Sequence, residues 1–242
     1  MDFTYEQVAK MIDHSLLNPT LTWADLERGC HIARDYQVAS VCIMPFALKH
    51  CTEILLGSGV KPSTTIGFPH GANRTETKLA EAKAAIADGG EELDMVVNIS
   101  KVLSADWGYV RHDIHALSHE AHERGAKLKV IFENCYLSDD HKVRLCEICG
   151  EIGVDWVKTS TGYGSGGATD ADLILMRKHS PANVQVKAAG GVRTLDRLLE
   201  VKALGVTRCG ATQTVAMLEE AKRRLGMATG VGAQAEGAPG LY

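Results

Sequence analysis

Short apolar runs alternate with longer amphipathic segments along almost the whole chain, and this alternation constrains the fold more than any other feature. Eight of the runs have the length and composition of β-strands. They are residues 13–16, 39–44, 63–67, 92–97, 128–133, 155–159, 184–189 and 206–210. Successive runs begin roughly 20 to 35 residues apart, which leaves room for one helix and two loops in each interval.

The segments between these runs carry the marks of helices. Four have clear ends: residues 77–88, 106–124, 138–149 and 194–204. Gly89, Gly125, Gly150 and Gly205 follow them, and Ser138 is a candidate N-cap for the third. Eight strand–helix units predict a parallel sheet closed into a single-domain (β/α)8 TIM barrel. An open doubly wound α/β sheet is the alternative, but no change in strand order is evident.

Length and charge narrow the class of protein. The 242 residues suit one barrel domain, which we place at residues 1–227, with a flexible tail over residues 228–242. Tyr242 ends that tail, and either it folds back over the barrel mouth or the end is disordered. A net charge of -4 gives no electrostatic reason to expect nucleic acid or a membrane as partner. Without an apolar run of about 20 residues or a signal sequence, we expect a cytoplasmic protein.

Two lysines stand near the ends of consecutive predicted strands. Lys158 and Lys187 are both flanked by valines on the alternate parity, so both side chains are expected to face the barrel interior. Two ammonium groups about 6 Å apart repel by about 2.8 kcal/mol, or about 2 pKa units, at an effective dielectric constant of about 20. One of them should then be a neutral amine that attacks a carbonyl to form a Schiff base. Alternatively, each lysine pairs with a carboxylate and only fills the barrel.

Further polar residues interrupt the apolar strands. Asp94, Asp13 and Lys129 are expected inside the barrel, where they form a paired network with capacity for proton transfer. For Asp13 and Lys129, a structural salt bridge is an equally open interpretation. Cys42 on the second strand and residues 68–70 after the third are candidates for the lining of the site. The substrate contacts that we expect are Asp13, Ser15, Cys42, Lys129 and Thr161.

Glycine-rich loops follow the last three predicted strands. Barrel phosphate sites use the loops after strands 7 and 8 together with a helix N-terminus, where glycine lets backbone N–H groups approach the anion. Arg193 and threonine hydroxyls add donors. The phosphate-binding residues that we expect are Gly162, Gly190, Gly191, Arg193, Gly210, Thr212 and Gln213.

Eight segments together resemble the deoxyribose-phosphate aldolase family. They are IDHSLL (12–17), VCIMP (41–45), IGFPHG (66–71), ELDMVVNIS (92–100), LKVIFE (128–133), WVKTSTGYG (156–164), VKAAGGVRT (186–194) and RCGAT (208–212). The resemblance covers residues 8–220 and implies a class I aldolase without metal or cofactor. Its reaction is the reversible cleavage of 2-deoxy-D-ribose 5-phosphate to acetaldehyde and glyceraldehyde 3-phosphate. It also implies small-molecule partners and a homodimer or homotetramer.

The resemblance assigns roles to three residues that the strand pattern had already singled out. It places the Schiff-base lysine on Lys158, a second active-site lysine on Lys187 and the catalytic aspartate on Asp94. Because all three are present, a non-catalytic sugar-phosphate binder is disfavoured. An aldolase of the same mechanism that acts on a different or unphosphorylated aldehyde stays open.

The chain departs from the family after the eighth strand. The family usually has small hydroxyl residues there, whereas this sequence has Thr212 and Gln213. We therefore expect the phosphorylated sugar to be preferred by a smaller margin than is usual in the family.

Two weaker patterns lie on predicted helices. His112, His115, His119 and His122 share one helix face, which is the arrangement of a metal site but also of a solvated or subunit-contact surface. Because the helix belongs to the outer layer, we expect no metal there. Cys146 and Cys149 form a C-x-x-C late in a helix, where packing is the expected role.

Overall fold

Eight parallel strands close into a barrel in the computed structural model of the chain, which describes residues 3–229. Each strand pairs with its sequence neighbours, and the last pairs with the first. The strands are β1 (Ile12–Leu16), β2 (Ser40–Ile43), β3 (Lys61–Ile66), β4 (Glu92–Val96), β5 (Lys127–Ile131), β6 (Trp156–Lys158), β7 (Gln185–Ala189) and β8 (Arg208–Ala211). The predicted TIM barrel is therefore confirmed, and the open sheet is excluded. Residues 230–242, including Tyr242, lie outside the described residues, so the predicted tail stays a prediction.

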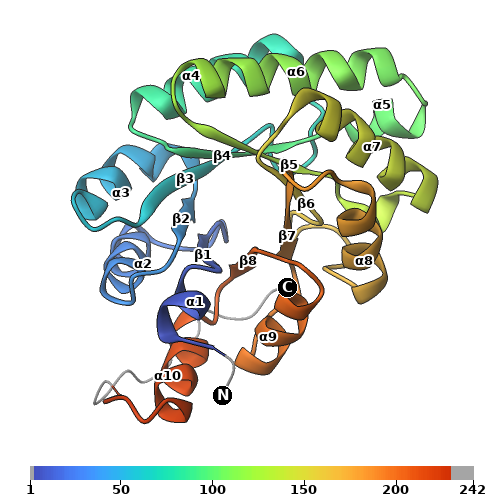
Figure 1. Cartoon of the computed structure of the whole chain (residues 1–242). Coiled ribbons are helices and arrows are strands. Elements are labelled where there is room, and N and C mark those ends of the chain that lie inside the picture. Colours follow the sequence, from blue (N-terminus) through green and yellow to red (C-terminus); the bar gives the residue numbers. More distant parts are fainter. Residues whose placement is uncertain (1–2, 230–242) are drawn as a thin grey trace.

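Helices surround the barrel as an outer layer (Figure 1). They are α1 (Tyr5–Ala9), α2 (Trp23–Asp35), α3 (Leu48–Leu55), α4 (Thr75–Ala87), α5 (Ile99–Leu103), α6 (Trp107–Glu123), α7 (Asp139–Ile152), α8 (Asp170–His179), α9 (Leu195–Ala203) and α10 (Thr214–Arg224). Two 3₁₀ turns, η1 (Pro45–Ala47) and η2 (Asn134–Tyr136), follow β2 and β5. The helix before β1 packs against α10.

Most helices begin and end next to the residues that cap them. Ser138 caps α7, and its side chain accepts from the backbone N–H of His141 at 3.3 Å. The expectation that α7 ends at Gly150 was wrong, because the helix continues to Ile152 and ends at Gly153, whose φ is 80°. Gly150 serves packing instead: a Cβ there would lie 2.8 Å from Cδ of Pro181.

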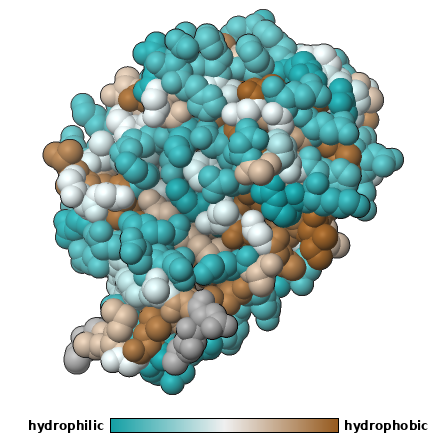
Figure 2. Space-filling model, in the orientation of Figure 1, coloured by the Kyte–Doolittle hydropathy of each residue, from teal (hydrophilic) through white to brown (hydrophobic). Residues whose placement is uncertain are grey.

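The core lies between the strands and the helices. Val157 and Val186, on the parity opposite to the two lysines, are fully buried. On the face in Figure 2, hydrophilic residues predominate and hydrophobic ones form small patches. No helix within residues 3–229 is long and apolar enough to cross a membrane.

A fully buried ion pair joins two outer helices behind β4. The ammonium of Lys78 on α4 lies 2.6 Å from the Asp113 carboxylate on α6 and donates to the Val96 carbonyl at 2.8 Å. Thr75 donates to the other Asp113 oxygen at 2.9 Å. Since both charges are out of water, the loss of one leaves the other unpaired at high cost.

We expect Lys78→Met to lower the free energy of unfolding by about 3–5 kcal/mol, because it strands the Asp113 carboxylate. Urea unfolding followed by circular dichroism measures this. Lys83→Met is the matched control, since Lys83 is on the same helix, is itself exposed and lies 3.7 Å from its partner Glu120. That control should cost less than about 1 kcal/mol. Equal losses in the two variants would contradict the importance of the buried pair.

Candidate active site

Lys158, Lys187 and Asp94 meet inside the barrel. Lys158 ends β6 and lies directly beside Lys187 of β7 in the strand register. Both ammonium nitrogens lie 2.7 Å from the same oxygen, Oδ2 of Asp94. The two nitrogens are therefore within twice that distance of each other, slightly closer than the sequence argument assumed. All three side chains are almost completely buried.

The surroundings of the two lysines separate their pKa values. Burial lowers the pKa of Lys158, and the nearby charge of Lys187 lowers it further, against the opposing effect of Asp94. Burial acts in the same direction on Lys187, but the charges of Asp13 and Asp94 outweigh it and raise the pKa of that group. Lys158 is thus the more easily deprotonated amine and Lys187 its cationic neighbour. A neutral amine beside a fixed cation is one recognised form of an activated nucleophile.

Below these groups, a second layer of charges fills the barrel. Lys129 contacts Asp94 at 2.9 Å, Glu92 at 2.6 Å and Asp13 at 3.3 Å. The other contacts of Asp13 are Lys187 at 2.6 Å and Arg208 at 2.5 Å. Despite burial, the charges of Lys129, Lys187 and Arg208 hold the pKa of Asp13 well below its usual range. Asp13 and Lys129 therefore do form an ion pair, and that pair belongs to the same network as Asp94.

Glu92 and Arg208 complete this layer, and the sequence reasoning missed both. They begin β4 and β8 and pair with each other at 2.8 Å. Each precedes by two positions a residue that the sequence argument had placed inside or at the site, Asp94 and Gly210. The same strand parity was the signal that could have found them.

Ser15 and Cys42 face each other across β1 and β2 in the strand register. Burial raises the pKa of the Cys42 thiol, and the charge of Asp94 raises it further. The Cys42 thiol is therefore protonated, and its side chain serves as part of the wall of the site. Ser15 is half-buried at the same level of the barrel.

Thr161 fixes the glycine-rich loop after β6. Its hydroxyl donates to the Glu133 carboxylate, and its backbone N–H donates to the same group at 3.2 Å. The Thr161 oxygen in turn accepts from the N–H of Tyr163 at 2.9 Å. Glu133 is buried and has a φ of 59°, a left-handed conformation that is uncommon outside glycine. No local sequence pattern points to Glu133 as a residue of the site.

Four of the predicted phosphate ligands line one cavity of about 310 Å³. They are Gly162, Gly190, Gly191 and Arg193, and residues 164–169 complete the lining. The loops after β6 and β7 touch here, since a Cβ on Gly167 would lie 2.6 Å from the Gly190 carbonyl oxygen. The N-terminus of α8 follows directly, capped by the Thr169 side chain. Open backbone, a helix N-terminus and a guanidinium suit an anion such as phosphate.

The remaining three predicted phosphate ligands do not line that cavity. Gly210 is within β8, and Thr212 and Gln213 lie between β8 and α10. Gln213 takes the N-cap position of α10, but its side chain makes no capping hydrogen bond.

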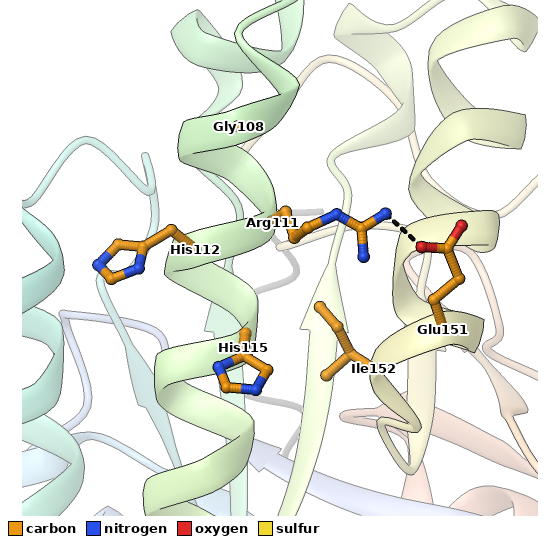
Figure 3. A pocket seen from close by; sticks show the side chains of 6 residues that line it. All are labelled: Gly108, Arg111, His112, His115, Glu151 and Ile152. Atoms are coloured by element: carbon orange, nitrogen blue, oxygen red, sulfur yellow. Dashed lines mark hydrogen bonds and ion pairs between the residues drawn. The ribbon is translucent and has the colours of Figure 1, made fainter.

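Two of the four histidines on α6, His112 and His115, line a second cavity, of about 450 Å³, between α6 and α7 on the outside of the barrel. Figure 3 shows Arg111 reaching across to Glu151, whereas His112 points away to the other side of α6. His115 stacks on His119 with ring centroids 6.2 Å apart, and His122 pairs with Asp155 at 2.8 Å. Within residues 3–229, no group of three His, Cys, Asp or Glu side chains could hold a metal ion.

The C-x-x-C residues are buried in α7. Burial raises the pKa of both thiols, to about 11 for Cys146 and well above its ordinary value for Cys149. Buried protonated thiols pack as small apolar groups.

The chain is similar in sequence and in structure to proteins described as aldolases. A family model described as DeoC/LacD family aldolase matches residues 7–231. A deoxyribose-phosphate aldolase of Rhodopirellula baltica is 64% identical over 226 residues, which are 93% of this chain and 94% of that protein. One of Thermococcus kodakarensis is 45% identical over 217 residues, which are 89% of this chain and 97% of that protein. The solved tetrameric deoxyribose phosphate aldolase of Aeropyrum pernix matches with a TM-score of 0.83 and 30% identity, covering 90% of this chain and 92% of that one.

Proposed function

The chain belongs to the DeoC/LacD family of aldolases, and on that premise we propose that it reversibly cleaves 2-deoxy-D-ribose 5-phosphate to acetaldehyde and D-glyceraldehyde 3-phosphate. The observation that carries the proposal is the buried Lys158 amine, whose pKa is lowered by burial and by the charge of Lys187. The carboxylate of Asp94 lies 2.7 Å from it, within reach for proton transfer.

The reaction begins at the Lys158 amine. Its nitrogen attacks C1 of the open-chain sugar, and the carbinolamine loses water to give a protonated imine. When the C3 hydroxyl gives up its proton, the electrons of the C2–C3 bond move into the imine. Glyceraldehyde 3-phosphate leaves, and an enamine remains on Lys158. Protonation of the enamine at C2 and hydrolysis of the imine release acetaldehyde and return the free amine.

Asp94 and Lys187 are the proton-transfer groups of this scheme. Asp94 is anionic, because the charges of Lys129, Lys158 and Lys187 outweigh burial and hold its pKa below the usual range. It accepts the C3 proton directly or through a water molecule, and Lys187 donates to the departing hydroxyl of the carbinolamine. Each such transfer is worth roughly 10²- to 10⁴-fold in rate.

The glycine-lined cavity beside Arg193 is the proposed phosphate site. We expect Arg193→Ala to lower kcat/KM for 2-deoxyribose 5-phosphate by about 10- to 150-fold, because a hydrogen bond to a charged group is worth roughly 1.5–3 kcal/mol. The same variant should leave kcat/KM for unphosphorylated 2-deoxyribose within about twofold. Arg28→Ala, on the exposed face of α2, is the control and should change neither value. An equal loss of kcat/KM on both sugars would contradict a contact between Arg193 and the phosphate.

Release of acetaldehyde from 2-deoxyribose 5-phosphate by the purified protein tests the proposed function. A wild-type preference for unphosphorylated 2-deoxyribose would favour the alternative, an aldolase of the same mechanism with a different acceptor. Binding of the sugar phosphate without acetaldehyde release would favour a non-catalytic binder.

The oligomeric state and the cellular location are also proposals. We infer a homo-oligomer, a dimer or a tetramer, because the Aeropyrum pernix relative is described as tetrameric. Size-exclusion chromatography with light scattering distinguishes these states. We also infer a cytoplasmic location, because the charged sugar phosphate does not cross a lipid bilayer unaided.

A further inference from the structure

The side chain of Tyr163 reaches across the mouth of the barrel. Tyr163 lies in the loop after β6, and its hydroxyl donates to the carbonyl of Leu17, just after β1, at 2.6 Å. Its ring meets Phe68, just after β3, edge to face with centroids 5.3 Å apart. Neither β1 nor β3 neighbours β6 in the barrel. The tyrosine therefore connects loops from opposite parts of the rim.

The backbone that carries this ring is fixed from below. The Tyr163 N–H donates to Thr161, and Thr161 is held by the buried carboxylate of Glu133. The next residue is closely packed against the segment after β5, because a Cβ on Gly164 would lie 2.7 Å from the Cys135 sulfur and 3.0 Å from Cδ of Glu133. The backbone on both sides of the ring is therefore held by contacts within the protein.

The ring and the anion cavity lie on different sides of the same loop. Gly162 and Gly164 on either side of Tyr163 line the cavity, but the tyrosine does not. Its side chain is directed to the β1 and β3 loops instead. The loops after β6 and β7 carry the cavity, whereas Tyr163 makes its side-chain contacts to the loops after β1 and β3.

We propose that Tyr163, backed by Phe68, is a specificity-determining residue that limits the size of the acceptor aldehyde. The proposal rests on the proposed aldolase function. A compact acceptor such as glyceraldehyde 3-phosphate fits between the aromatic wall and the anion cavity. A long or branched aldehyde, which gains nothing from the cavity, needs the space that the two rings occupy.

The test compares the addition of acetaldehyde to two acceptors, hexanal and D-glyceraldehyde 3-phosphate. The quantity measured is the hexanal ratio, which is kcat/KM with hexanal divided by kcat/KM with D-glyceraldehyde 3-phosphate. Tyr163→Ala should raise this ratio by about tenfold or more, on the scale of hydrophobic-pocket discrimination. Tyr163→Phe keeps the ring and should stay within about threefold of wild type. Tyr109→Ala, a half-buried tyrosine on α6, is the matched control and should leave the ratio unchanged.

Phe68→Ala opens the same wall from the β3 side and leaves the sequence of the glycine-rich loop unchanged, so it tests the proposal even if Tyr163→Ala loosens that loop. It should raise the hexanal ratio as well, and the double variant should gain less than the product of the single effects, because contacting residues are not additive. Unchanged ratios in both alanine variants would overturn the proposal, as would a Tyr163→Phe ratio equal to that of Tyr163→Ala. A wild-type protein that forms no aldol from glyceraldehyde 3-phosphate would instead overturn the aldolase function itself.

Discussion

Lys158→Leu is expected to abolish turnover, with a loss on the order of 10⁴-fold or more, as for the loss of a nucleophile in other covalent enzymes. Without the amine no imine forms, and the C2–C3 bond has no electron sink. The barrel should still fold, because Asp94 keeps its ion pairs with Lys129 and Lys187. Acetaldehyde release measures the activity, and the thermal midpoint reports the fold.

Borohydride reduction with acetaldehyde identifies the reacting amine directly. Peptide mass mapping should find the ethyl adduct on Lys158 in the wild type and on no active-site lysine in Lys158→Leu. Lys127→Leu, which removes an exposed lysine at the start of β5, is the control and should trap normally. An adduct on Lys187 would reverse the assignment of nucleophile and neighbouring cation.

The sequence predicted the barrel and the central lysines because both depend on local patterns. Strand alternation and flanking valines suffice to place Lys158 and Lys187 on one parity, and the closed barrel brings them into register. Glu92 and Arg208 were missed because they begin their strands, where charged residues are usually solvated. Only closure of the barrel buries them against Asp13 and Lys129.

Loop residues were harder to place, since their positions depend on contacts between distant segments. Nothing near Glu133 in the sequence shows that it holds Thr161, because the two meet only when the β5 and β6 loops fold together. The predicted phosphate-binding residues illustrate the same limit. Gly190 and Arg193 line one cavity, whereas Thr212 and Gln213 lie outside its lining.

Removal of the neighbouring cation should have the second large effect. Lys187→Met keeps an unbranched apolar side chain in the barrel and should lower kcat for deoxyribose 5-phosphate cleavage roughly 10²- to 10⁴-fold through loss of a proton-transfer group. It should also shift the pH profile. The charge of Lys187 lowers the pKa of Lys158, and Asp94 raises it. Loss of Lys187 removes the first effect and leaves Asp94 to act more strongly on Lys158.

Both changes raise the pKa of Lys158, so the amine is protonated up to a higher pH. The acidic limb of kcat/KM, which reports the free enzyme, should therefore move toward higher pH in Lys187→Met, and so should the rate of borohydride trapping. Lys187→Arg retains the positive charge and should keep the limb near its wild-type position even where its activity falls, which separates the electrostatic role from proton transfer. If Lys187→Met shows a wild-type acidic limb, Lys187 does not set the ionisation of Lys158, and burial alone has to account for the neutral amine.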